Sequence, residues 1–161
     1  MLVVATTLTQ APNDKQQVQP MVKVLQEQAA KLGDAKTLIA DTGYCSENNI
    51  KVCEEAKIEP LLSVARQDHH PHWRERFTEP ATLAQDATPM QAMTHRLTTK
   101  AGRAAYAIRK QTVEPVFGII KSVMGFRQFS MRGLRKVTGE WNLVCLAWNV
   151  KRMAVLRPKV G

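Results

Sequence analysis

The sequence predicts an α/β domain of alternating strands and helices, followed by a basic helical part. Three observations predict this class. Residues 1–65 alternate between short runs rich in β-branched residues and segments with apolar residues at three- and four-residue steps, the pattern of layered α/β domains. Residues 93–157 keep the helical period almost throughout. Residues 66–92 contain three prolines and keep neither period, so an irregular insertion or long loop is expected there.

The first two elements expected are a strand and a helix. Residues 2–9 are rich in valine and threonine and are predicted to form a strand. In residues 15–32 the apolar side chains recur at helical spacing, which predicts an amphipathic helix. Pro20 is tolerable only near the first turn of that helix or at a slight kink. Gly33 is expected to end it.

Two more strands are expected, with a helix between them. Thr37–Ala40 is a short apolar run, and residues 60–65 (PLLSVA) form another. Ser46 has the side chain of a helix N-cap, which predicts a helix from there to about Ala56. A helical connection makes parallel pairing of these two strands the expectation.

The second half is predicted to be helical, with two interruptions. Residues 99–101 are expected to divide two helices, and residues 125–133 to form a turn rich in Arg and Phe. Leu134–Leu156 is predicted to be a long final helix.

The charge of the chain is distributed unevenly. The formal net charge is +9, yet residues 1–95 carry 9 Lys/Arg against 12 Asp/Glu. Residues 96–161 carry 14 Lys/Arg against only Glu114 and Glu140. This asymmetry favours a polyanionic partner for the second half. A solvated basic face is the alternative that charge alone leaves open.

Other compositional features exclude several classes of protein. No apolar run approaches the roughly 18 residues that a membrane-spanning helix needs, so no membrane partner is expected. The first ten residues lack the basic flank and the cleavage site of a signal peptide. Cys45, Cys53 and Cys145 are too sparse for a disulfide scaffold. A reduced, cytoplasmic setting is therefore expected, with Cys45 and Cys53 as packing residues.

Asp41 is the first candidate functional residue. It directly follows the predicted strand Thr37–Ala40, and ligands gather at the carboxyl ends of strands in α/β sheets. Hard divalent cations such as Mg²⁺ bind carboxylate oxygens there. Spacing alone favours the alternative, in which Asp41 starts a turn with Gly43 behind it.

Glu114 is the second candidate. Its neighbours Val113, Val116 and Phe117 are apolar, so it is expected near the buried side of a helix, where a charge needs a partner or a metal. The alternative partner is a nearby cation, Arg109 or Lys110. Pro115 predicts either a kink or a new first turn at this point.

Three further features of the sequence are weaker candidates for a site. His69, His70 and His72 do not have the spacing of a zinc motif, so a solvated loop is expected for them. The apolar residues of the last helix are expected to be core. Phe126 and Phe129, interleaved with Arg127 and followed by Arg132, are better candidates for DNA contacts, since phosphate contacts need only exposed arginine. The last-helix residues in question are Trp141, Leu143, Leu146, Trp148 and Val150.

Several segments together resemble the DDE-type transposases of bacterial insertion sequences. They are LIADTGYCSENNI around Asp41, the spacing Tyr106-x-x-Arg109 followed by Glu114 and Lys121, GFRQFSMRGL, and the closing EWNLVCLAWNVKRM. The resemblance covers nearly the whole chain and is weakest across residues 66–92. It implies a ribonuclease-H-like catalytic core whose first strands are missing from these residues, followed by C-terminal helices.

The resemblance also implies roles for individual residues. Asp41 matches the family's second metal-binding acid and Glu114 its third, with Mg²⁺ or Mn²⁺ as the cofactor. The Tyr-Arg-Glu-Lys signature falls on Tyr106, Arg109, Glu114 and Lys121. Four residues separate Arg109 from Glu114 where three are usual, so Lys110 is an alternative for the basic role. These cations, with Arg127 and Arg132, are implied to bind DNA phosphates.

The implied reaction is cleavage of DNA phosphodiester bonds followed by strand transfer, with transposon ends and target DNA as partners in the bacterial cytoplasm, at the nucleoid. Another transposase chain is a further possible partner. The reaction needs three carboxylates and two are matched, since Asp14 is a poor substitute for the first. A truncated transposase that is inactive alone is therefore expected. The alternative is a non-catalytic basic module that binds DNA or assembles with, and interferes with, full-length transposase.

Overall fold

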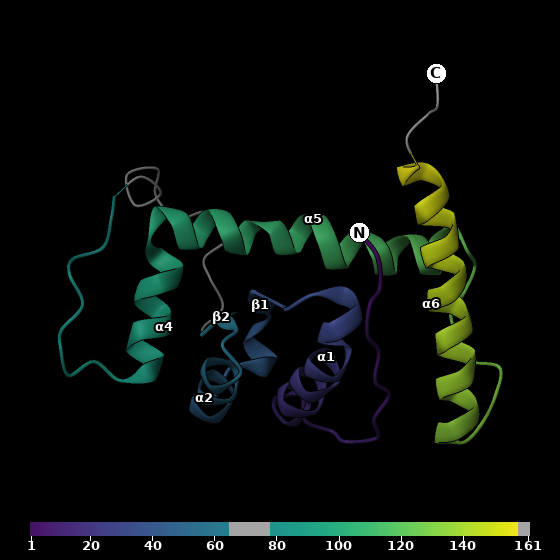
Figure 1. Ribbon diagram of the computed structural model, residues 1–161, viewed down its shortest axis with the longest axis horizontal. Helices are drawn as coiled ribbons and strands as arrows, with labels where there is room; N and C mark the ends of the chain where they lie inside the picture. Colours follow the sequence, from purple (N-terminus) through teal and green to yellow (C-terminus); the bar gives the residue numbers. More distant parts are fainter. Residues whose placement is uncertain (65–77, 158–161) are drawn as a thin grey trace. The chain divides into compact units, whose positions relative to one another are not determined.

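The computed structural model describes residues 1–64 and 78–157 (Figure 1). The chain divides into two compact units, Ala11–Arg109 and a second unit made of Met1–Gln10 with Lys110–Gly161. The described elements, in chain order, are η1 (Asp14–Gln17), α1 (Val18–Leu32), β1 (Thr37–Ala40), η2 (Thr42–Tyr44), α2 (Glu47–Glu55), β2 (Glu59–Leu62), α4 (Pro89–Thr98), α5 (Lys100–Ser122) and α6 (Leu134–Leu156).

A two-stranded parallel sheet forms part of the Ala11–Arg109 unit. In β1 and β2, Thr37 lies opposite Glu59 and Ala40 opposite Leu62. Helix α2 makes the crossover, as the sequence predicted, and Ser46 caps it by accepting the N–H of Asn49 at 3.2 Å. Helix α1 ends at Gly33, whose φ of 80° suits glycine. Over the described ranges, this mixture of helices and a small parallel sheet confirms the coarse α/β class.

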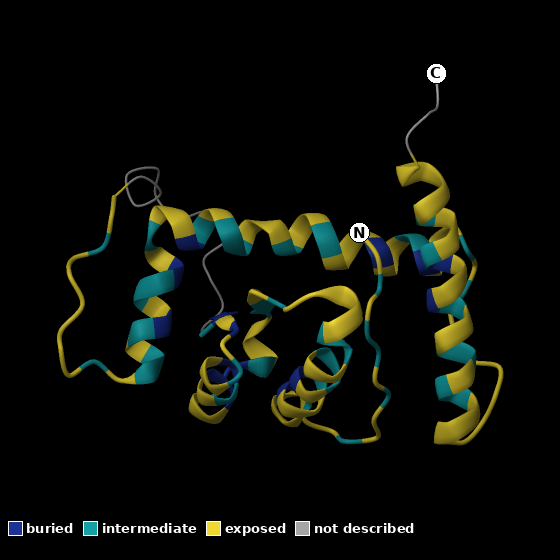
Figure 2. Ribbon diagram, viewed as in Figure 1, coloured by how far each residue is buried: buried dark blue, intermediate teal, exposed yellow. Residues whose placement is uncertain are grey.

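Two clusters of buried side chains hold this unit together. The larger joins α2, β2 and α4, and the smaller joins α1 to the end of α2 and the start of β2. The facing sides of these helices carry the buried positions (Figure 2). The larger cluster contains Cys45, Ile50, Leu61, Leu62, Met93 and Leu97, and the smaller contains Val18, Val22, Cys53 and Ile58.

The other unit is built on the part of α5 from Lys110 onward, α6 and the first ten residues. Val116, Ile120 and Trp148 form its buried centre. The N-terminal segment is fixed to α6 by the side chain of Asn149, whose Oδ1 accepts the Val3 N–H at 2.8 Å and whose Nδ2 donates to the Val3 carbonyl at 2.7 Å. The indole N–H of Trp148 also donates to the Met1 carbonyl, at 3.3 Å.

The strand predicted for residues 2–9 is therefore wrong, since the structure assigns none of these residues to a strand. The reason is visible at Val3, where one side-chain amide takes both backbone groups that a neighbouring strand would take. The local sequence specifies an extended backbone but does not specify its partner.

Two features of the helices also differ from the sequence prediction. Helix α4 begins at Pro89, four residues before Met93, because Thr88 and Gln91 form a capping box. Helix α5 runs through Pro115 without ending, so Pro115 does not start a new helix.

The predicted break between two helices is confirmed and lies at Thr99, since α5 begins at Lys100. The turn at 125–133 and the bounds of Leu134–Leu156 are also confirmed. Of the apolar residues of the last helix expected to be core, Trp148 is buried, but Leu143, Leu146 and Val150 are exposed, so that part of the prediction is wrong. His69, His70 and His72 lie outside the described residues.

The three cysteines are buried, and burial raises the pKa of each thiol. We expect Ellman's reagent to modify them slowly in the native chain and rapidly in denaturant, because the thiolate is the reactive form. The unfolded thiols ionise first, so the folded chain holds more protons and stability should fall as the pH rises past the ordinary thiol pKa of 9.0. Urea unfolding at two alkaline pH values measures this, and an unchanged free energy of unfolding would contradict it.

No helix within residues 1–64 and 78–157 is both long enough and apolar enough to cross a membrane.

Candidate functional site

Asp41 lies at the carboxyl end of β1, where it does two things. Its Oδ1 accepts the backbone N–H of Thr42 at 2.7 Å and so caps η2. Its Oδ2 lies 3.3 Å from Nη1 of Arg109. The turn-forming role that the sequence allowed is thus present, and it leaves the second oxygen directed to a cation. The Asp41 side chain as a whole is 58% exposed.

Arg109 reaches Asp41 from α5, 68 residues further along the chain. Its guanidinium carbon lies 5.7 Å from the centre of the Tyr106 ring, one helical turn earlier. Tyr106 in turn packs against the larger buried cluster. The aromatic ring and the carboxylate therefore fix the guanidinium, and three of the predicted site residues, Asp41, Tyr106 and Arg109, meet within one unit.

A buried asparagine supports the turn that follows Asp41. Asn49 is 2% exposed, and its Nδ2 donates to the carbonyls of Lys15 at 2.8 Å and of Tyr44 at 2.7 Å. It thereby joins η1 to η2. Asn49 was not among the residues singled out from the sequence. Its burial is indicated in the sequence by its position, because Asn49 lies next to Ile50 and four residues before Cys53, on the buried face of α2.

This connection brings Asp14 to the same turn. A Cβ on Gly43 would lie 3.3 Å from Oδ2 of Asp14. Burial raises the pKa of Tyr44, and the nearby carboxylates of Asp14 and Asp41 raise it further. Two carboxylates therefore act on one phenol at this end of the unit. In the described ranges, no group of three or more His, Cys, Asp and Glu side chains is arranged to hold a metal ion.

Glu114 belongs to the other unit and is exposed, so the prediction that it faces the buried side of its helix is wrong. The buried line of this part of α5 passes through Val116 and Ile120, four residues apart. Glu114 precedes Val116 by two residues, which is about 200° around an α-helix. Glu114 has apolar neighbours on both sides in the sequence, so the sequence alone did not show which of them form the buried side of the helix.

The remaining predicted DNA-binding residues are cations of this second unit. Lys110, Lys121, Arg127 and Arg132 are all exposed. Arg127 lies in the turn between α5 and α6, which Glu140 holds by accepting the N–H groups of Ser130 at 2.8 Å and Met131 at 3.1 Å. The Ser130 N–H is the largest cause that lowers the pKa of the Glu140 carboxyl.

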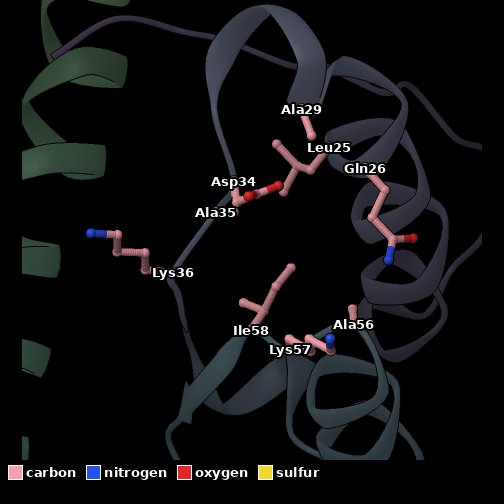
Figure 3. A pocket seen from close by; sticks show the side chains of 9 residues that line it. All are labelled: Leu25, Gln26, Ala29, Asp34, Ala35, Lys36, Ala56, Lys57 and Ile58. Carbon is pink, nitrogen blue, oxygen red and sulfur yellow. The ribbon is translucent and has the colours of Figure 1, made fainter.

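A separate cavity of about 490 Å³ lies elsewhere in the Ala11–Arg109 unit (Figure 3). Leu25 and Ala29 of α1 line it, together with Lys36 and Ile58 near the starts of the two strands. It is at the amino ends of β1 and β2, whereas Asp41 follows the carboxyl end of β1. It is therefore not part of the site around Asp41.

Comparison with known proteins identifies the family to which the chain belongs. Residues 74–154 match the family described as "Transposase DDE domain". The match covers half of the chain and includes Tyr106, Arg109, Glu114 and Lys121, while Asp41 precedes it. No curated protein and no solved structure matches the chain. By this match, the chain belongs to the transposases that carry a DDE domain.

Proposed function

We propose that the chain is the C-terminal part of a ribonuclease-H-like transposase core that cleaves DNA and transfers strands with Mg²⁺ or Mn²⁺. Asp41 and Glu114 are the two metal-binding carboxylates in this proposal. The observation that supports it is the ion pair between Asp41 and Arg109, whose guanidinium lies over the ring of Tyr106. The family resemblance assigns these residues to one active site, and they come together from distant parts of the sequence.

The chemistry of the side chains suits these roles. Carboxylate oxygens are the ligands that Mg²⁺ and Mn²⁺ prefer, and Asp41 is sufficiently exposed to offer one. When bound, a pair of such ions activates the attacking oxygen and stabilises the leaving oxygen of a phosphodiester. Arg109 has the bidentate fork that fits a phosphate. In the DNA complex, Arg109 exchanges part of its contact with Asp41 for a phosphate oxygen.

The basic residues of the second unit supply the rest of the DNA contact. Lys110, Lys121, Arg127 and Arg132 are exposed and are proposed to bind backbone phosphates. In this proposal they hold the DNA in register without reading its sequence. Only two carboxylates match the family's three, so we propose that these 161 residues bind DNA but do not cut it.

The test of this function combines binding and cleavage. We expect salt-sensitive binding to duplex DNA, with Lys121→Ala or Arg127→Ala each lowering the salt slope by about one charge. Lys151→Ala on α6 removes the same charge from an exposed position outside the proposed interface and is the control. Mn²⁺ binding, followed by electron paramagnetic resonance, should weaken at least about ten-fold in Asp41→Asn.

Two outcomes separate this proposal from its rivals. DNA binding with no Mn²⁺ affinity, indifferent to Asp41→Ala and Glu114→Ala, would favour a non-catalytic module that interferes with full-length transposase. Robust Mg²⁺-dependent nicking of plasmid DNA that Asp41→Ala abolishes would overturn the inactivity of these residues alone. In that case Asp14→Asn tests whether Asp14 is the additional carboxylate.

A further inference from the structure

An aromatic cavity opens in the unit formed by Met1–Gln10 and Lys110–Gly161. Its volume is about 360 Å³, within the range of small-molecule sites. Helix α5, the turn that follows it and α6 each contribute to its wall. The side chains that matter are four aromatic rings, Phe117, Phe126, Phe129 and Trp141, and two cations, Lys121 and Arg127.

The rings of this cavity are arranged in one connected group. Phe117 and Trp141 are stacked, with centroids 6.0 Å apart and an angle of 8° between planes. Phe126 and Phe129 meet edge to face at 5.4 Å, and both contact Trp141. Nevertheless Phe117 is 45% exposed and Phe129 is 41% exposed. Two phenyl rings in one cavity thus keep a large part of their apolar surface in water.

The same cavity is positively charged and held in shape. Lys121 and Arg127 line it, and among residues 1–64 and 78–157 no Asp or Glu does. The carboxylate of Glu140 is occupied by the backbone N–H groups of Ser130 and Met131. This contact fixes the turn that carries Arg127 and Phe129, so the rings are in place before a ligand arrives.

We propose, on the basis of the proposed function, that this cavity takes an unpaired DNA base whose phosphates lie against Lys121 and Arg127. Sites for single-stranded nucleic acid combine aromatic platforms with cations that follow the backbone. A base inside a duplex has no free face for stacking. The cavity therefore distinguishes single-stranded or locally opened DNA from intact duplex.

The test compares two oligomers of equal length, an oligothymidine and an abasic sugar-phosphate chain. They carry the same phosphates, so a contact limited to phosphates would bind them equally. We expect the oligothymidine to bind roughly ten-fold more tightly to the unaltered chain in fluorescence anisotropy. This comparison requires no protein variant, so its result cannot be attributed to misfolding.

Protein variants then locate the preference. Phe129→Ala and Phe117→Leu should remove most of the difference between the two oligomers while leaving the salt slope unchanged, because neither alters charge. Leu143→Ala, the truncation of an exposed apolar side chain on α6 that does not line the cavity, should keep the difference. Circular dichroism and urea unfolding check that each variant is folded.

Three results would contradict this proposal, and they can be told apart. Equal affinity of the unaltered chain for the two oligomers would overturn the base-binding cavity and leave the proposed function standing. A preference for oligothymidine that survives in both folded phenylalanine variants would also overturn it. If neither oligomer nor duplex DNA binds, the proposed function fails, and this proposal fails with it.

Discussion

Replacing Gly102 with alanine is expected to destabilise the Ala11–Arg109 unit by about 3 kcal/mol or more, at the upper end for overpacking. Gly102 is buried in the corner where α4 ends and α5 begins. A Cβ there would lie far inside van der Waals contact with the carbonyl oxygen of Arg96, and 3.1 Å from Oγ1 of Thr99. The obstacle is backbone rather than a flexible side chain, so it cannot move without disturbing α4.

The corner also has hydrogen bonds that a shift would disturb. The Thr99 hydroxyl donates to the Arg96 carbonyl at 2.8 Å and accepts the Gly102 N–H at 3.0 Å. Urea unfolding followed by circular dichroism measures the loss. Gly118→Ala is the matched control, because it lies in the same helix and, apart from the neighbouring backbone of that helix, the added methyl would have no atom within 4 Å. It should stabilise by about 0.5–1 kcal/mol, and equal effects at the two sites would refute the steric argument.

Replacing Asn49 with alanine is expected to cost about 2–4 kcal/mol of unfolding free energy. The change removes both donors from the carbonyls of Lys15 and Tyr44, and a buried acceptor left without its partner costs roughly 1–3 kcal/mol. Because Asn49 joins η1 to η2, its loss should also loosen the turn next to Asp41. The pKa of Tyr44 should then move back toward its ordinary value of 10.0.

Two further variants isolate the role of the amide. Asn49→Asp keeps the size of the side chain but cannot donate when ionised, so it should be at least as harmful as alanine. Asn48→Ala changes the exposed neighbour on the same helix and should stay within about 0.5 kcal/mol of the unaltered chain. The phenol pKa is measured in a Tyr106→Phe background, where Tyr44 is the one tyrosine left. A stable Asn49→Asp variant would exclude the hydrogen-bonding explanation.

The helices and strands that are defined by residues close together in the sequence could be predicted from the sequence. Thr37–Ala40 and Leu134–Leu156 have the predicted bounds, because apolar periodicity and turn residues define them within a few positions. Helix α2 begins after Ser46 for the same reason. The partner of residues 2–9 could not be predicted, since Asn149 lies 146 residues from Val3. Nothing in a local pattern specifies such a pairing.

In the candidate site too, local contacts could be predicted from the sequence and long-range contacts could not. The place of Asp41 after β1 followed from the order of strand and turn residues, and its capping contact with Thr42 is local. Its ion pair with Arg109 depends on how α5 packs and could not be predicted from spacing. The exposure of Glu114 was mispredicted because several apolar neighbours offered more than one possible buried line.

The docking of Val3 on Asn149 has a consequence for chain entropy. One unit is assembled from two segments, Met1–Gln10 and Lys110–Gly161, and the other is inserted between them. The entropic cost of closing such a loop grows only with the logarithm of its length, by about 0.6 kcal/mol for each doubling. Additional residues in an exposed loop of the inserted unit therefore change the stability of the outer unit little. A loss of contacts at Val3, by contrast, acts on the outer unit directly.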